Sequence, residues 1–191
     1  MGPAPGAAGA CGARGSLGAL AMREVALDAP EVRPLLEGLG REYDRRYGAN
    51  DELAAYGADD FVPPAGAFLL VEQDGVAVAG GGLRRLDVAT GEIKRMWTAP
   101  EARRRGHGHR VLAALEEAAR TRGYARVLLE TGTEQPEAVA LYAAAGYERV
   151  APYGRYRDDP RTICMAKDLG GGGRVGPSEE VGGRDGRERV S

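Results

Sequence analysis

The stretch that decides the fold is Trp97–Leu112, which reads WTAPEARRRGHGHRVL. It leaves a run typical of a β-strand, crosses a turn with two glycines and enters a pattern typical of a helix. Glycine allows the backbone to approach an anion, and the first N–H groups of a helix have no partner within the helix. Three consecutive arginines, Arg103–Arg105, add positive charge at the same place. The stretch therefore predicts a phosphate-binding turn.

The spacing of the glycines narrows the kind of phosphate site. No Gly-Lys-Ser/Thr follows, so the turn is not a P-loop, and the dinucleotide pattern G-x-G-x-x-G fails at Val111. The pattern that fits is R-x-x-G-x-G, at Arg103, Gly106 and Gly108. This arrangement resembles the pyrophosphate loop of the GNAT N-acetyltransferases, which bind acetyl-coenzyme A. Arg104 stands where that family often has a glycine, a departure that matters if the position requires a positive φ.

A second block downstream strengthens the resemblance. Residues Gln135–Tyr147 read QPEAVALYAAAGY, which is similar to the family's N-x-x-A-x-x-L-Y-x-x-x-G-F. Gln135 replaces the asparagine and Tyr147 replaces the phenylalanine. Both blocks occur in the family's order, and the similarity extends from about residue 22 to about residue 169. The segments Leu129–Gly132 and Pro152–Tyr156 resemble a small-molecule branch of the family.

Length and composition agree with an enzyme of one domain. The chain has 191 residues, 43% of them hydrophobic, which suits a single core with tails. A formal charge of −2 provides no basic field, so a nucleic-acid partner is not expected. Apolar runs are shorter than the roughly 20 residues that span a bilayer, so no membrane association is expected. Two widely separated cysteines indicate a reducing, cytoplasmic location.

The two ends of the chain differ from its middle. Residues 1–21 consist largely of Gly, Ala and Pro without periodicity, and we expect a disordered leader there. Residues 170–191 combine a glycine run with mixed charges, which predicts a disordered tail. The catalytic domain is therefore expected at residues 22–169. Met22 is an alternative start of translation.

Between these ends, strand and helix patterns alternate. Asp74-Gly75 separates two strand-like runs and predicts a tight hairpin. A helix is expected from an N-cap at Asp28 to Tyr43, and a third helix from Pro136 to a C-terminal glycine at Gly146. Between them, the helix after the glycine turn is expected to bury Val111, Leu112, Leu115, Ala118 and Ala119. The expected strands are residues 23–27, 68–73, 76–86, 92–98, 126–131, 147–150 and 162–167. The alternation predicts an α/β fold with a mixed central sheet covered by helices on both faces.

The resemblance implies how the coenzyme is held. In the family two central strands splay apart, and the backbone of the earlier strand binds the pantetheine arm as a further strand would. The pyrophosphate then lies on the amides of the glycine turn. The residues implied in acetyl-CoA binding are Met96, Trp97, Thr98, Arg103, Arg104, Arg105, Gly106, Gly108, His109, Gln135 and Tyr142.

Acetyl transfer to an amine also needs proton transfer. Tyr142 stands where the family has a tyrosine that protonates the departing thiolate; the alternative is a ring that only packs on its helix. Glu92 is the candidate general base, because Glu92-Ile93 resembles the Glu-Ile at which the histone-modifying branch has its base. An exposed strand-end carboxylate paired with Lys94 or Arg95 is equally compatible with the sequence. Glu130 competes for the role of base.

Other polar and aromatic residues receive less specific interpretations. His107 and His109 lack a third ligand nearby, so no metal is expected. Cys164 is interpreted as a buried strand residue. Four cationic residues are expected on solvated faces, with the alternative that one of them holds a substrate carboxylate: Arg84, Arg85, Lys94 and Arg95. Five tyrosines flank the segments that close over the acceptor in this family and could form an aromatic lid: Tyr43, Tyr47, Tyr56, Tyr153 and Tyr156.

The sequence therefore predicts an acetyl-CoA-dependent N-acetyltransferase that acts on the amine of a small metabolite, such as an amino acid or a related compound, by direct attack in a ternary complex. A protein or peptide N-acetyltransferase is one alternative, and a non-catalytic acyl-CoA sensor is another. The sequence does not decide between a monomer and a homodimer.

Overall fold

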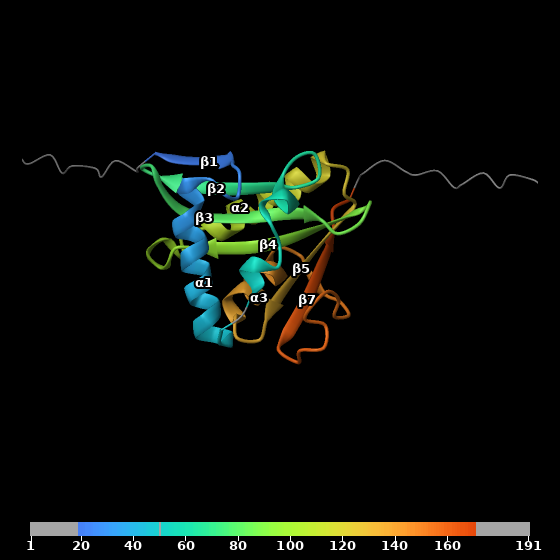
Figure 1. The fold of residues 1–191 in the computed structure, drawn as a ribbon. Helices are drawn as coiled ribbons and strands as arrows, with labels where there is room; N and C mark the ends of the chain where they lie inside the picture. The colour runs from blue at the N-terminus through green and yellow to red at the C-terminus, as the bar shows by residue number, and fades with distance from the viewer. Residues whose placement is uncertain (1–18, 50, 171–191) are drawn as a thin grey trace, which may run out of the picture.

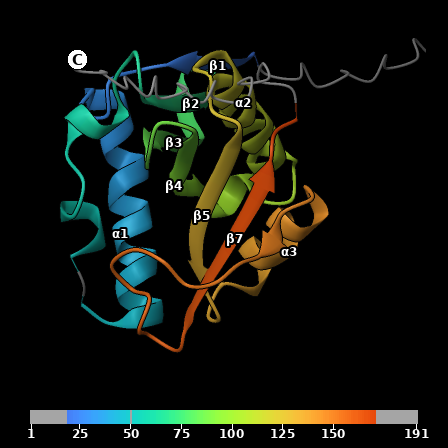
Figure 2. The same ribbon diagram turned by 90° about the vertical axis from the view of Figure 1, so that its right-hand side faces the viewer.

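A computed structural model describes residues 19–49 and 51–170, which form one seven-stranded sheet with helices on both faces (Figure 1). The strand order is β1-β2-β3-β4-β5-β7-β6. Helix α1 covers one face, and α2 and α3 cover the other (Figure 2). The strands are β1 (Leu20–Glu24), β2 (Ala67–Gln73), β3 (Val76–Arg85), β4 (Thr90–Thr98), β5 (Arg126–Gly132), β6 (Glu148–Arg149) and β7 (Thr162–Asp168). The helices are α1 (Arg33–Tyr47), α2 (His107–Thr121) and α3 (Pro136–Ala144), with short 3-10 turns η1 (Pro30–Val32), η2 (Glu52–Ala54), η3 (Ala58–Phe61) and η4 (Pro100–Ala102).

The first strand differs from its prediction. β1 runs antiparallel to β2 from the Leu20–Gln73 pair to the Glu24–Leu69 pair, so it begins three residues before the expected strand. Residues 20 and 21 therefore belong to the sheet and not to the expected leader. All five side chains of β1 are exposed, and an edge strand without a buried face leaves no hydrophobic alternation to detect. Residues 1–18 of the expected leader and residues 171–191 of the expected tail lie outside the described residues.

The hairpin between β2 and β3 agrees with the sequence. Asp74 and Gly75 have φ values of 53° and 78°, and Gln73 pairs with Val76 across them. Two successive positive φ values match the twist of antiparallel strands, which is why Asp-Gly is favoured here. The hairpin places β3 beside β4, the strand that leads to the phosphate-binding turn.

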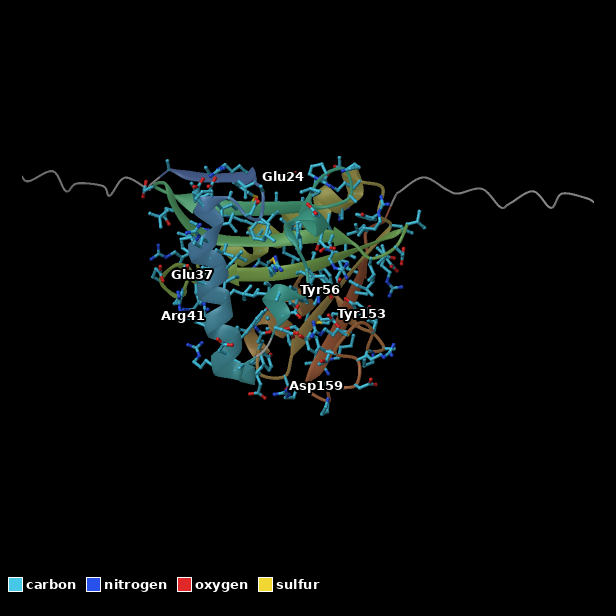
Figure 3. The ribbon with its side chains drawn as sticks, in the orientation of Figure 1. Glu24, Glu37, Arg41, Tyr56, Tyr153 and Asp159 are labelled. Atoms are coloured by element: carbon cyan, nitrogen blue, oxygen red, sulfur yellow. The ribbon has the colours of Figure 1, made fainter. Side chains whose placement is uncertain are left out.

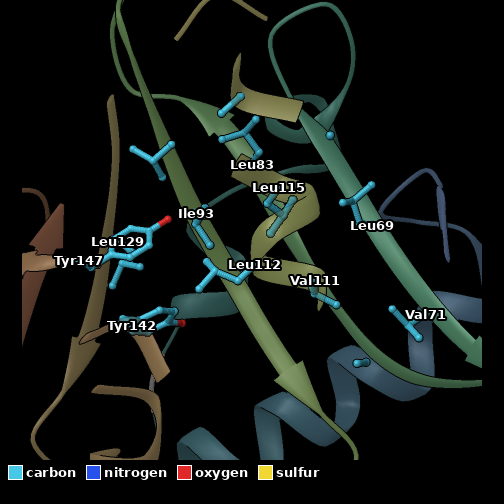
Figure 4. Close-up of a cluster of buried hydrophobic side chains, with 14 of the residues drawn as sticks. Leu69, Val71, Leu83, Ile93, Val111, Leu112, Leu115, Leu129, Tyr142 and Tyr147 are labelled. Carbon is cyan, nitrogen blue, oxygen red and sulfur yellow. The ribbon is translucent and has the colours of Figure 1, made fainter. Parts of the chain in front are cut away.

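The main hydrophobic core lies between the sheet and α2 (Figure 4). The α2 side chains of Val111, Leu112 and Leu115 are at most 1% exposed and face Leu83 and Ile93 of the sheet. A smaller core under α1 contains Val32, Leu35, Phe61, Phe68 and Leu70. The predicted apolar face of α2 is thus confirmed. Burial of these side chains fixes both helices against the sheet.

Strands β4 and β5 separate halfway along their length. Their parallel pairing runs from Thr90–Arg126 to Ile93–Leu129, after which β4 stays with β3 and β5 stays with β7. A bulge accompanies the separation: Arg95 has φ 59°, and the β3–β4 register shifts between Gly80 and Gly82. The expected splay of the central strands is present, and it opens at Lys94 and Glu130.

Candidate active site

A groove of about 780 Å³ lies along the outer part of β4, the turn after it, the start of α2 and one side of α3. Leu39 and Glu42 of α1 also border it. Ten of the eleven residues expected to hold the coenzyme line this groove: Met96, Trp97, Thr98, Arg103, Arg104, Gly106, Gly108, His109, Gln135 and Tyr142. Arg105 is exposed on the turn and is not among the residues that border the groove.

The turn has the backbone geometry that an anion site needs. Gly106 precedes α2 with φ 83°, and the Arg110 N–H donates to its carbonyl at 3.1 Å. The N–H groups of residues 107–109 therefore come before the helix's own hydrogen bonds. Arg104 has φ 62°, so a long side chain occupies a left-handed position that the family often gives to glycine. His107 is buried, and neither ring nitrogen has a hydrogen-bond partner in the described residues. Burial lowers the pKa of His107.

Arg103 braces the turn against α1. Its Nε donates to the Thr98 carbonyl at 3.1 Å, and a terminal guanidinium nitrogen donates to the Glu42 carboxylate. Arg46 donates to the same carboxylate at 2.6 Å and also to Glu137 of α3. The sequence analysis missed Glu42 and Arg46. The available signal was that Glu42 lies three residues after Leu39, on the apolar side of the helix.

Two interpretations of Tyr142 were considered from the sequence, a proton donor at the coenzyme site and a ring that only packs on its helix, and the structure shows features of both. Its side chain borders the groove, yet the residue is only 5% exposed and its ring packs at a tilt on Tyr147, 5.9 Å between centroids. Burial raises the pKa of its hydroxyl, so the phenol is neutral and holds its proton. Packing of the ring and contact with a ligand are thus compatible at this position.

A second cavity of about 230 Å³ lies between α1, β5 and the segment before β7. Tyr43 and Tyr47 come from α1, Glu130 comes from β5, and Gln135 borders both this cavity and the groove. The other lining residues are Ala49, Glu52, Thr131, Gly132, Tyr156, Asp159, Arg161 and Thr162. A Cβ at Gly132 would clash with the Tyr47 hydroxyl, so glycine makes room for that ring. Gln135 is the lining residue that the two cavities share, and Glu130, where β5 begins to separate from β4, borders the second cavity.

Beside this cavity lies a cluster of buried charges centred on Lys94. Its Nζ is 3.4 Å from Glu92 Oε1 and 3.5 Å from Glu52 Oε1, and it donates to Glu130. The Lys94 side chain is 4% exposed, and Arg95 is equally buried, which corrects the expectation of solvated faces for both. Burial opposes the charge on Lys94, but the three carboxylates outweigh it and raise the pKa.

Glu92 and Glu130 have different surroundings. Glu92 is 1% exposed and is absent from the residues that border the two cavities. Its Oε2 accepts from Arg84 at 2.7 Å, and its Oε1 accepts from the Tyr153 hydroxyl at 3.0 Å. Glu130 borders the second cavity, and its Oε1 is buried without a hydrogen-bond partner in the described residues. Burial raises the pKa of Glu130. Of the two candidate bases, Glu130 is thus the one that borders a cavity.

The segment between β6 and β7 forms part of the wall of the second cavity. Arg155 of this segment pairs with Asp51, and the hydroxyl of Tyr153 reaches Glu92. Tyr56, labelled with Tyr153 in Figure 3, contacts the same charge cluster, because the Arg84 guanidinium stacks over its ring at 4.2 Å. Of the five tyrosines expected in a lid, Tyr43, Tyr47 and Tyr156 border the cavity, whereas Tyr56 and Tyr153 pack on the charge cluster.

Comparison with known proteins agrees with this arrangement. The sequence profile of the acetyltransferase (GNAT) family matches residues 32–147. The chain belongs to this family. An IAA acetyltransferase of Azospirillum brasilense is 37% identical over 103 residues, which are 53% of this chain and 67% of that protein.

Solved GNAT structures share the fold. A Klebsiella pneumoniae protein assigned as an acyl-CoA N-acyltransferase superposes with a TM-score of 0.67 at 28% identity, over 78% of this chain and 97% of the other. A GNAT acetyltransferase of Elizabethkingia anophelis with acetyl-CoA bound gives 0.59 at 16% identity, over 78% and 97%. This chain is thus a GNAT acetyltransferase, and the family's reaction is acetyl transfer from acyl-CoA.

The expected absences of a membrane partner and of a bound metal stay predictions. Within residues 19–49 and 51–170, no helix is long and apolar enough to cross a bilayer. The same residues contain no group of three or more His, Cys, Asp and Glu side chains placed to hold a metal ion. Cys164 is buried in β7, as its interpretation required.

Proposed function

We propose that this GNAT enzyme transfers the acetyl group of acetyl-CoA to the amine of a small molecule, by direct attack in a ternary complex. The observation that carries the proposal is the pair of cavities beside the splay of β4 and β5, which share Gln135 in their linings. The groove of about 780 Å³ is lined by ten of the residues expected to hold the coenzyme, and the second cavity is much smaller. Its volume of about 230 Å³ is below the roughly 300–1,000 Å³ of sites for drug-sized ligands.

Acetyl-CoA would bind along the groove. After the bulge, the backbone of Met96–Thr98 would bond the pantetheine arm, and the amides after Gly106 would hold the pyrophosphate. The buried, unpartnered His107 supports a polar ligand at this point. Arg104 and His109 add polar groups at the rim, whereas Arg103 would support the turn through Glu42. Arg105 would contribute only long-range attraction.

In the reaction, the amine nitrogen attacks the thioester carbonyl, the C–S bond breaks and the thiolate leaves. Tyr142 would donate its proton to that thiolate, because a neutral phenol beside the groove is a competent acid. The ammonium proton would pass to Glu130, directly or through water. Glu92 would then be a positioning residue that holds Lys94, which in turn orients Glu130.

The alternatives predict other behaviour. A protein or peptide substrate needs an open groove beside the sheet, and the segment between β6 and β7 occupies space there through its Arg155–Asp51 and Tyr153–Glu92 contacts. A sensor would bind acetyl-CoA without turnover. We therefore disfavour a peptide acceptor. A cytoplasmic location and homodimer formation stay predictions from the sequence.

Thiol release across a panel of small amines and of peptides with free amino groups tests the proposal. We expect release with small amines, a product heavier by one acetyl group, and intersecting initial-velocity lines typical of a ternary complex. Release with peptides alone would favour the protein acetyltransferase. Binding of acetyl-CoA with no amine-dependent release would favour the sensor.

A further inference from the structure

The lining of the second cavity is unevenly charged. Three carboxylates border it, Glu52, Glu130 and Asp159, against one cationic side chain among the described lining residues, Arg161. Arg161 forms a bidentate ion pair with Asp159: its Nε lies 3.1 Å from Asp159 Oδ1, and a terminal nitrogen lies 2.8 Å from Oδ2. The two neutralise each other in the loop before β7, where Asp159 is labelled in Figure 3. The charged lining residues outside this pair are the carboxylates Glu52 and Glu130.

The charge cluster behind the cavity does not reverse this sign. Its cations Arg84, Lys94 and Arg95 balance the carboxylates Glu52, Glu92 and Glu130, and Asp60, whose side chain is 38% exposed and lies 3.9 Å from Arg84, adds one negative charge. Lys94 is surrounded by three of these carboxylates, and Arg95 donates to the carbonyls of Leu53 and Tyr56. The cations of the cluster are therefore engaged by groups of this chain.

The uncharged part of the lining is aromatic. Tyr43 and Tyr47 pack edge to face, 6.4 Å between ring centroids, and Tyr156 completes the wall. Aromatic faces next to carboxylates attract organic cations. A carboxylate brought into the same space would meet Glu52 and Glu130 with no uncommitted cation among the described lining residues, and like charges at such a distance strongly oppose binding.

We infer that the acceptor cavity selects primary amines without a carboxylate beside the reacting nitrogen and rejects α-amino acids. The inference rests on the proposed function, because it names the acceptor class of the same site. One entering ammonium would neutralise the excess negative charge, and its hydrocarbon part would lie against the tyrosines. An α-carboxylate would be carried into the most negative part of the cavity together with the amine.

Matched substrates isolate the carboxylate. Phenethylamine and phenylalanine differ only by that group, as do butylamine and norvaline, and phenylalanine amide has the bulk without the charge. With saturating acetyl-CoA, we expect kcat/KM for each amine to exceed that of its amino acid at least about tenfold. The amide should behave like the amine. Rejection of the amide together with the acid would make the exclusion steric and overturn the inference.

A variant tests whether the lining charge is the cause. Glu52→Gln removes one negative charge from the cavity and should reduce the preference for amine over amino acid several-fold. Asp158→Asn is the matched control, because that side chain is 96% exposed and lies outside the cavity lining. Equal acceptance of both members of each pair, or an unchanged preference in Glu52→Gln, would contradict the inference.

Binding without chemistry separates this inference from the proposed function. With coenzyme A in place of acetyl-CoA no acetyl group is transferred, so calorimetry measures phenethylamine and phenylalanine binding directly. The amine should bind at least about tenfold more tightly. If no amine is ever acetylated but this preference holds, the proposed reaction is wrong and the charge selection stands. Failure of the amine to bind, or equal binding of both, overturns the inference.

Discussion

Arg104 shows how a single residue can depart from its family and keep the local geometry. Its φ of 62° lies in the left-handed region, where a side chain costs roughly 1–2 kcal/mol. The substitution adds a cation at the rim of the groove at the expense of backbone strain. The same position thus affects stability and coenzyme binding in opposite directions.

Replacing this residue separates the two effects. Arg104→Gly should stabilise the protein by roughly 0.5–1 kcal/mol, the strain relieved less the greater chain entropy that glycine loses. Arg104→Ala removes the same charge and keeps the strain, so it is the matched control. Urea denaturation measures both. Equal unfolding free energies for the two variants would mean that the position is not strained.

Tyr142→Phe keeps the packed ring and removes only the hydroxyl. We expect kcat to fall roughly 10²-fold while acetyl-CoA affinity stays close to that of the wild type, because general acid catalysis contributes on this scale. Tyr147→Phe is the control: it is the neighbouring buried tyrosine and is absent from the lining of the groove. Similar losses in both variants would indicate damaged packing instead of a lost proton donor.

The pH profile distinguishes the two candidate bases. Burial raises the pKa of Glu130, and a base must be ionised, so kcat/KM should fall as the pH drops through a value above the usual range for glutamate. Glu130→Gln should remove this acidic limb and most of the activity. Glu92→Gln should keep the limb and lower the unfolding free energy, since Arg84 and Lys94 lose a partner. The reverse pattern would assign the base to Glu92.

At the scale of elements, the turn between β4 and α2 has to combine an anion site with a helix start. Gly106 meets both demands, because its φ of 83° aims the following amides and a side chain there would be strained. The Arg103–Glu42 pair then ties the turn to α1, so the groove and the acceptor cavity share one helix.

Gly106→Val should weaken acetyl-CoA binding at least about tenfold by straining this turn. Gly75→Val is the matched control, since Gly75 has φ 78°, likewise has open space around it and lies in the β2–β3 hairpin. Both variants should lose stability, and only Gly106→Val should lose affinity in calorimetry. Wild-type affinity in Gly106→Val would refute the phosphate-binding role of the turn.

For the whole molecule, β1 extends the sheet to residue 20, before the expected start of the catalytic domain at residue 22. β1 contacts β2 through main-chain pairing and through the Arg23–Glu72 ion pair at 2.8 Å, and Glu24 reaches Arg122 after α2 at 2.9 Å. These contacts join an exposed edge strand to two other parts of the domain.

Two truncations test this boundary. Removing residues 1–18 should leave the Tm nearly unchanged, because their composition provides little apolar surface to bury. Removing residues 1–24 also uncovers the edge of β2, and the Tm should fall by more than about 4 °C. Calorimetric scans of both proteins provide the measurement. A large drop in the shorter truncation would show that the leader packs on the domain.

The sequence alone determined the features that depend on neighbouring residues. Asp74-Gly75 predicted its hairpin, Val111, Leu112 and Leu115 predicted the buried face of α2, and the R-x-x-G-x-G turn before a helix predicted the fold family. Each signal acts within a few residues, because turn geometry and helical periodicity are local properties. The first residues of β1 were not predicted for the same reason, since an exposed strand has no buried face that a sequence pattern could reveal.

The tertiary structure was needed to show which charged groups border a cavity. Glu92 and Glu130 look alike in sequence, but Arg84 and Tyr153 engage one of them, whereas the other borders a cavity. Lys94 is buried because Glu52, far away in sequence, and two strand carboxylates surround it. Burial and charge depend on what distant segments bring together, and no local pattern encodes that contact.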